Sequence, residues 1–157
     1  MTLDPTARTA NIKDSLKKFF VDNIFRTSGI PLSFDKALSS PKLQGQTAVT
    51  RWVSVRLDDL ELDTLSTQDL SIYCCTRGDR EGYRLAQTVD TVMGYLTDNT
   101  QTDGFKRIPF YRSYETQPWT LLGAMLVTGH TLSAEQEALD ETKFRIITVT
   151  LRFASKV

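Results

Sequence analysis

Two adjacent cysteines followed by Arg-Gly-Asp are the residues of this chain most suggestive of chemistry. They occur in the stretch LSIYCCTRGDREGYRL, residues 70–85. Neighbouring side chains of a strand point to opposite faces of a sheet, so Cys74 and Cys75 cannot grip one metal ion together. Structural zinc needs four cysteine or histidine ligands, whereas the chain has two cysteines and one histidine. We predict that Cys74 is buried and that Cys75 joins neither a disulfide nor a metal site, with a lone reactive thiol as the alternative.

The Arg-Gly-Asp sequence at residues 77–79 invites comparison with adhesion tripeptides. A corner between a strand and a helix explains it more simply, because Gly78 allows a sharp turn. Asp79 is then predicted as the helix N-cap, where its carboxylate accepts hydrogen bonds from free amides and favours the positive end of the helix dipole. Three-residue adhesion motifs also arise readily by chance, so we favour the corner.

The sequence carries few other catalytic signals. It has no Walker-type glycine loop, no Gly-x-Ser-x-Gly elbow and no His-Glu-x-x-His helix. His130 falls in a polar segment and is predicted to be a solvated loop residue. A catalytic triad built on it would need a nucleophile and an acid that the spacing does not supply. A small enzyme that uses Cys75 or His130 remains an alternative.

Four carboxylates gather in the short segment LDDLELDTL. Oxygen ligands at this spacing could hold a divalent cation, but the glycine and closing glutamate of an EF-hand loop are missing. We predict a solvated hairpin tip that discourages pairing of sheet edges, with the cation site as the alternative. The four residues are Asp58, Asp59, Glu61 and Asp63.

A fourth cluster, FKRIPFYRSYE at residues 105–115, mixes basic and aromatic side chains. Such a mixture can stack single-stranded nucleic acid. However, nineteen basic side chains balance nineteen acidic ones, so no global field attracts nucleic acid. We therefore predict a strand with one packed and one wet face, without specific nucleic-acid binding. The basic members are Lys106, Arg107 and Arg112.

The elements that position these residues follow from hydrophobic periodicity. Spacings of three and four predict helices at residues 9–25 and 79–96. Alternation predicts strands at residues 48–57, 70–75, 108–115, 120–128 and 143–153. The segment DDLELDTLSTQD is predicted as a hairpin connection with some strand at each end. Polar loops are expected at residues 33–47, 97–104 and 129–142, the last with a helical turn.

This order of elements predicts an α+β fold: a mostly antiparallel sheet of about four to five strands, flanked by two main α-helices on one face. Residues 1–157 are expected to form a single domain, with 1–8 as a flexible N-terminal arm. No apolar run approaches the roughly 20 residues of a membrane helix. The N-terminus lacks the pattern of a signal peptide, so folding in the cytosol and reduced cysteines are expected.

Several segments together resemble the tail terminator (tail completion) proteins of long-tailed bacteriophages. They are the amphipathic N-terminal helix, RWVSVRLDDLELDTLSTQDLSIYCCTRGDREGYRLAQTVDTVMGYL, IPFYRSYE and the closing FRIITVTLRF. The resemblance covers residues 11–153 and rests on the order of the elements and on the general pattern of residue types along them. Its most telling part is a strand ending in Arg-x-Asp, followed by a helix that opens with Gly-Tyr.

The resemblance implies a structural virion protein with no catalytic residues and no cofactor. Its partners would be further copies of itself in a hexameric ring, the tail tube protein, and a head-completion or connector protein. The ring would cap the head-proximal end of the tail tube, with DNA passing through it. The location implied is the virion tail and neck, and the host cytoplasm during assembly. Another phage neck protein, such as a head-closure or adaptor subunit, is the alternative.

Ring closure brings one face of each protomer against a different face of the next. From charge alone, the acidic segment at residues 58–63 would supply one side of this interface and basic positions the other. The polar loops would dock neighbours, since loops often carry function. The basic positions are Arg51, Arg56, Lys106, Arg107 and Arg112.

Overall fold

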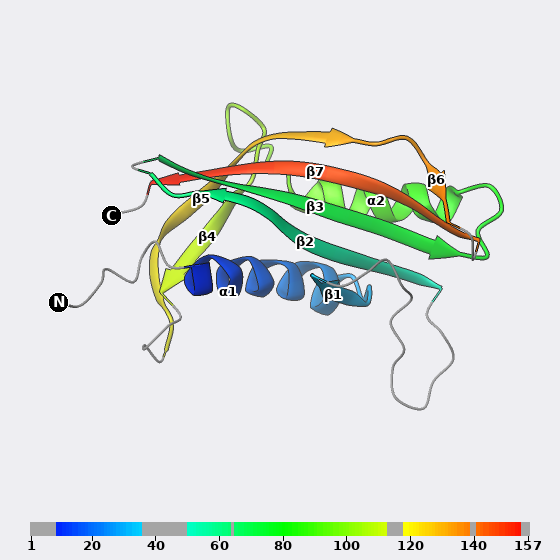
Figure 1. Ribbon diagram of the computed structural model, residues 1–157, viewed down its shortest axis with the longest axis horizontal. Helices are drawn as coiled ribbons and strands as arrows, with labels where there is room; N and C mark the ends of the chain where they lie inside the picture. The colour runs from blue at the N-terminus through cyan, green and yellow to red at the C-terminus, as the bar shows by residue number, and fades with distance from the viewer. Residues whose placement is uncertain (1–8, 36–49, 64, 113–117, 139–140, 155–157) are drawn as a thin grey trace.

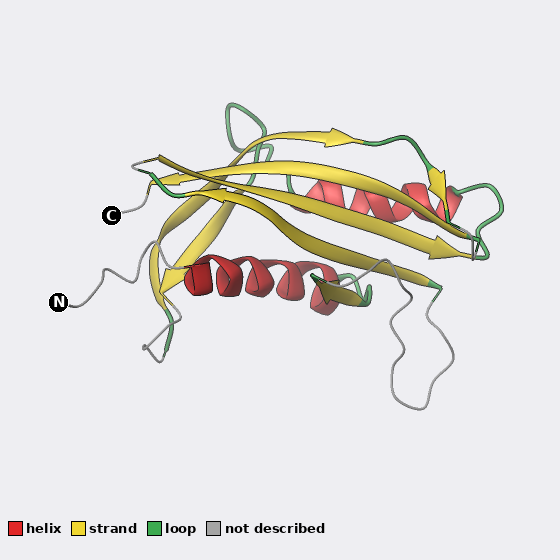
Figure 2. Cartoon of the chain, viewed as in Figure 1, coloured by secondary structure: helices red, strands yellow, loops and turns green. Residues whose placement is uncertain are grey.

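The computed structural model describes residues 9–35, 50–63, 65–112, 118–138 and 141–154 (Figures 1 and 2). Its helical segments are α1 (Thr9–Phe20), the π-helical η2 (Val21–Thr27) that continues it, and α2 (Tyr83–Tyr95). Its strands are β1 (Leu32–Phe34), β2 (Arg51–Glu61), β3 (Leu65–Arg77), β4 (Arg107–Arg112), β5 (Thr120–Leu132), β6 (Gln136–Glu137) and β7 (Thr142–Ala154). The expected N-terminal arm, residues 1–8, lies outside the described residues.

The strands form one seven-stranded sheet in the order β1-β2-β3-β7-β5-β4, with β6 paired to the start of β7. The β1–β2 pair is parallel and the other pairs are antiparallel. In Figure 1, the long strands β2, β3 and β7 run side by side, while β5 and β4 bend away towards α1. Register shifts within β2–β3, β5–β7 and β4–β5 accompany this curl, since bulges bend and twist a strand.

Both helices pack on the same face of the sheet. Strand register places Val55, Ile72 and Ile147 on neighbouring strands of one face, and all three are buried. Apolar side chains of the two helices join them in a single cluster: Ile12, Leu16 and Phe20 from α1, and Leu85, Val89 and Val92 from α2. The predicted α+β architecture is therefore confirmed. The sheet has more strands than predicted, partly because β1 and β6 span three and two residues, too few for a periodic signal.

Helix α1 also closes the free edge of β4. The backbone N–H of Tyr111 donates to Ser15 Oγ at 2.9 Å, and that hydroxyl lies 3.4 Å from the Tyr111 carbonyl oxygen. Pro109, in the middle of β4, has no N–H to offer. This edge is thus protected against pairing with a strand of another chain.

The segment after Thr128 differs from its prediction. Strand β5 continues to Leu132, so His130 lies in a strand and not in a solvated loop. Its ring meets Phe105 edge-on, with centroids 5.4 Å apart. In the described part of residues 129–142, the segment expected to hold a helical turn instead contains β6, which pairs with β7. The structure of this segment is determined by its pairing with the distant strand β7, and the local polarity of the sequence does not indicate that pairing.

Strand β2 is buried on both faces from Trp52 to Val55. Trp52 and Cys75 are paired across β2 and β3 and are fully buried, on the face away from the helices. The polar loop predicted at residues 33–47 is also interrupted, because Ser33 and Phe34 belong to β1, while residues 36–49 lie outside the described part. The loop at residues 97–104 is confirmed. No described helix is long and apolar enough to cross a membrane.

Candidate assembly surfaces

The acidic hairpin, defined here as residues 58–63 and 65, is formed by the end of β2, the start of β3 and the described part of their connection. Most of its acidic segment belongs to β2, which continues to Glu61, so the connection is shorter than predicted. The register shift between Leu57 and Leu60 places a bulge there. The buried Gln68 side chain holds this bulge by donating to the carbonyl oxygens of Asp58 and Asp59, at 3.2 and 3.3 Å.

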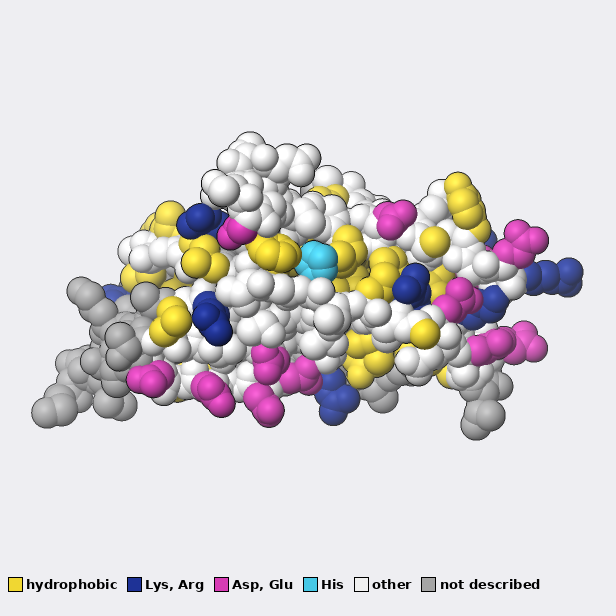
Figure 3. All heavy atoms as spheres, turned by 90° about the horizontal axis from the view of Figure 1, so that it is seen from above, with side chains coloured by type: hydrophobic (Ala, Val, Ile, Leu, Met, Phe, Trp, Pro, Cys, Tyr) yellow, Lys and Arg dark blue, Asp and Glu magenta, His cyan; other side chains and the backbone are white. Residues whose placement is uncertain are grey.

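The acidic hairpin presents carboxylates and leucines to solvent. Its four acidic residues are all exposed, and Figure 3 shows acidic side chains in a row along one long border of the molecule. Leu62 and Leu65 beside them are 50% and 54% exposed. Within the described part of the chain, no three His, Cys, Asp or Glu residues form a group able to hold a metal ion. The hairpin thus combines negative charge with uncovered apolar surface.

The five basic positions assigned to the opposite side of a ring interface do not gather in one place. Arg51 and Arg56 lie on β2, the strand that carries part of the acidic hairpin, so they do not form a side opposite to it. Arg107 and Arg112 begin and end β4, and Lys106 precedes it. Strands β3, β7 and β5 separate β4 from β2 in the sheet. A basic surface separate from the acidic hairpin is therefore available at β4, whereas Arg51 and Arg56 share β2 with the hairpin.

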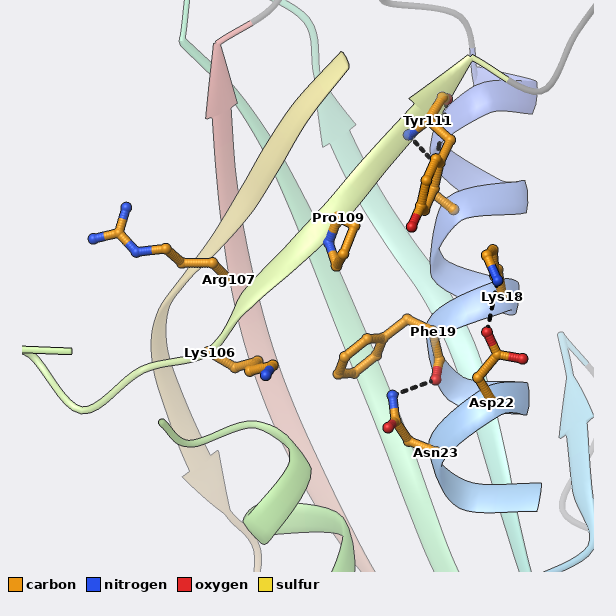
Figure 4. A pocket seen from close by; sticks show the side chains of 9 residues that line it. Lys18, Phe19, Asp22, Asn23, Lys106, Arg107, Pro109 and Tyr111 are labelled. Atoms are coloured by element: carbon orange, nitrogen blue, oxygen red, sulfur yellow. Dashed lines mark hydrogen bonds and ion pairs between the residues drawn. The ribbon is translucent and has the colours of Figure 1, made fainter. Parts of the chain in front are cut away.

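A groove between α1 and β4, called the α1–β4 groove below, is a feature that sequence reasoning missed. It encloses about 310 Å³, and its walls include Phe19 from the helix and Pro109 and Tyr111 from the strand. In Figure 4, Lys106 and Phe19 extend into the space between helix and strand, whereas Arg107 points away from α1. The groove thus combines the apolar surface of Phe19, Pro109 and Tyr111 with the lysines Lys18 and Lys106.

An adjoining hollow of about 660 Å³ extends the α1–β4 groove and shares Lys18, Asp22 and Tyr111 with it. Lys18 Nζ forms an ion pair with Asp22 at 2.7 Å and lies 5.9 Å from the centre of the Tyr111 ring. Trp119 adds a second aromatic wall, its ring centroid 6.2 Å from that of Tyr111. Helical periodicity could not place Lys18 beside β4, because that strand follows more than eighty residues later.

The two cysteines lie in the interior, as expected for Cys74. Both are fully buried, and among the described residues neither forms a disulfide. Burial raises the pKa of Cys74 to about 12, because a thiolate is poorly solvated there. The corner that follows them is also present: β3 ends at Arg77, and Gly78 adopts a positive φ of 71°.

Asp79 caps helix α2 but is not its N-cap residue, which corrects the prediction. The helix begins at Tyr83, and Gly82, with φ 70°, occupies the N-cap position without a side-chain hydrogen bond. Asp79 precedes the helix in the chain, and its carboxylate accepts a hydrogen bond from the Leu85 N–H at 2.9 Å. Burial by itself would raise the pKa of Asp79, but hydrogen bonds from the Leu85 and Arg84 amides and from Thr76 hold it below its usual value.

Replacing Asp79 with alanine is expected to lower the free energy of unfolding by about 0.5–2 kcal/mol, the range for losing a capping side chain. Asp79→Asn is the matched control, since it keeps the shape and one acceptor oxygen but removes the charge. Because the folded pKa is lowered, the contribution of the charge is present above the unfolded pKa of about 3.9 and is lost as the pH falls through the folded value. In denaturant unfolding, the difference in free energy of unfolding between wild type and Asp79→Asn should be smaller at pH 3 than at pH 7. Identical stabilities at pH 7 would exclude a capping role for the charge.

Comparison with known proteins yields a fold and no family. No protein-family model matches the chain, and no curated protein matches it. Seven chains of solved structures match. One of them, a protein named only by a sequence identifier, superimposes with a TM-score of 0.58 at 12% identity, covering 96% of this chain and 99% of its own. The likeness shows that the whole domain adopts a fold already seen in a chain of similar extent.

Proposed function

We propose that this chain is the subunit of a hexameric ring that caps the head-proximal end of a phage tail tube. The ring ends polymerisation of the tube and offers its outer surface to the head. Its partners are further copies of itself, the tail tube protein and a head-completion or connector protein. DNA passes through the ring, and the protein acts as a structural component of the virion without catalysis.

The observation that carries this proposal is the separation of two complementary surfaces on one protomer. The acidic hairpin projects from the β2–β3 side of the sheet, and the α1–β4 groove lies beyond three intervening strands. Two different patches of this kind favour head-to-tail association, which closes into a ring when the rotation per subunit permits. The order of elements behind the resemblance to tail terminators is also retained in the fold.

The treatment of sheet edges supports the same interpretation. Ser15 and Pro109 close the β4 edge, and the bulge between Leu57 and Leu60 disrupts the end of β2. Addition of a strand from another subunit at the β4 edge is therefore disfavoured. Contacts at this edge would instead be made by side chains, whose charges make the assembly sensitive to salt.

The mass of the purified protein in solution tests the ring directly. We expect a monomer–hexamer equilibrium, with a limiting mass six times that of the protomer, at low ionic strength. Raising the salt from 0.1 to 1 M should shift the equilibrium towards monomers, because the Debye length falls from about 10 to about 3 Å. Sedimentation velocity over a concentration series measures both quantities. A stable dimer, or a mass unaffected by salt and concentration, would contradict the proposed ring.

A further inference from the structure

We propose that the acidic hairpin of one copy docks into the α1–β4 groove of the next copy. This inference rests on the proposed ring and names the two surfaces that form its repeating contact. The partner is a second copy of this chain, and the docked element is the β2–β3 connection with its carboxylates and leucines. The groove receives the leucines on its floor and the carboxylates at its borders.

The acidic hairpin and the α1–β4 groove both expose apolar side chains that could pack against each other. Leu62 and Leu65 are half or more exposed, an unfavourable state for large apolar side chains that docking would relieve. The groove and its extension offer aromatic and proline surface from Phe19, Pro109 and Trp119. Aromatic side chains that line a hollow are typical anchors of protein interfaces.

The charges of the two surfaces are opposite. The acidic hairpin carries four carboxylates, whereas the groove and its extension are lined by five basic and two acidic residues. Lys106 extends into the groove, where its positive charge also interacts with the Asp98 carboxylate. The Lys18 side chain is 39% exposed where it pairs with Asp22, so its ammonium is accessible to a further carboxylate. Complementary charge favours this encounter and disfavours contact between two like hairpins.

Hydrogen bonds within one protomer already fix the backbone of the acidic hairpin before any partner binds. The Gln68 side chain donates to the carbonyl oxygens of Asp58 and Asp59 and also to that of its neighbour Asp69, at 2.7 Å. Ser66 Oγ accepts from the Asp63 N–H at 3.2 Å. An element whose backbone is already fixed loses less conformational entropy on binding. The same rigidity keeps the hairpin on its own side of the sheet, away from the groove of its own protomer.

Charge exchange tests this docking with the full-length protein. The hairpin variant carries Asp58→Lys, Asp59→Lys and Glu61→Lys, and the groove variant carries Lys18→Glu and Lys106→Glu. A third protein combines all five substitutions. Asp90→Lys and Arg152→Glu, at exposed positions of α2 and β7, serve as matched controls for charge reversal elsewhere. Thermal melting of each protein verifies its fold, and sedimentation velocity at low salt measures its self-association.

We expect the hairpin and groove variants each to associate about a hundredfold more weakly than wild type, because like charges then face each other. An equimolar mixture of the two should recover assembly, since each hairpin then meets a groove of opposite charge in alternating order. An alternating ring needs an even number of subunits, which six satisfies. The five-substitution protein should recover homomeric assembly, and the two control variants should match wild type.

Either of two results would overturn the docking: folded hairpin and groove variants that assemble like wild type, or failure of both the mixture and the combined protein to recover. A wild type that remains monomeric at low salt and high concentration would overturn it as well. Different results would contradict the proposed function. Open chains or dimers that follow the charge-exchange pattern would keep the docking and exclude the hexameric cap, whereas a hexamer indifferent to the substitutions would keep the ring and exclude this contact.

Discussion

Replacing Phe20 with alanine is expected to lower the free energy of unfolding by about 3–5 kcal/mol, the range for removing a buried aromatic side chain. Phe20 is fully buried at the end of α1 and meets Phe19 edge-on, with ring centroids 5.4 Å apart. Its loss leaves a cavity where α1 packs on the sheet. For a domain of this size the melting temperature should fall by about 6–20 °C.

Phe25 supplies the matched control, because it follows in the next helical segment and is 52% exposed. Phe25→Ala removes the same atoms from a site that water already reaches. Its effect on unfolding should stay within about 0.5 kcal/mol, as for most surface substitutions. Chemical denaturation of the two variants compares them directly. Equal losses of stability would mean that α1 is not packed on the sheet through the Phe20 face.

Reversing the charge of the acidic hairpin is expected to abolish virus assembly without unfolding the protein. Asp58, Asp59 and Glu61 are exposed, so their replacement by lysine leaves the core intact. A phage that carries the three substitutions should lose nearly all infectious titre, because the rings fail to close. Electron microscopy of the lysates should show free heads and unjoined tails.

Adding Lys18→Glu and Lys106→Glu to the same phage should recover part of the titre by restoring opposite charges between subunits. The single reversal Asp90→Lys, on the exposed face of α2, should leave the titre unchanged. Normal titre in a phage with the reversed hairpin would show that this segment takes no part in assembly.

The parts of the fold that the sequence predicts are those decided within one segment. The spacing of Ile12, Leu16 and Phe20 correctly predicts the buried face of α1, and alternation through Ile147 and Val149 correctly predicts that of β7. Each pattern depends on residues a few positions apart. Both helices and the main strands therefore follow from periodicity alone.

The parts that the sequence does not predict depend on partners far along the chain. His130 lies in a strand because β5 continues along β7, and polar residues around it conceal that pairing. Asp79 caps from outside the helix because Gly82, with its positive φ, takes the N-cap position. The α1–β4 groove joins segments separated by more than eighty residues, so no local pattern could indicate that Lys18 and Tyr111 share a surface.

Tail length in a phage from which this gene is deleted is the most direct test of the proposed cap. If the protein ends tube polymerisation, electron microscopy of the deletion should show tails of uncontrolled length that are not joined to heads. Supplying the wild-type protein from a plasmid should restore tails of uniform length and their attachment. Tails of normal length attached to heads in the deletion would contradict the proposed function. Tails of normal length that fail to join heads would also contradict it, and would indicate a neck protein that acts after the tube is complete.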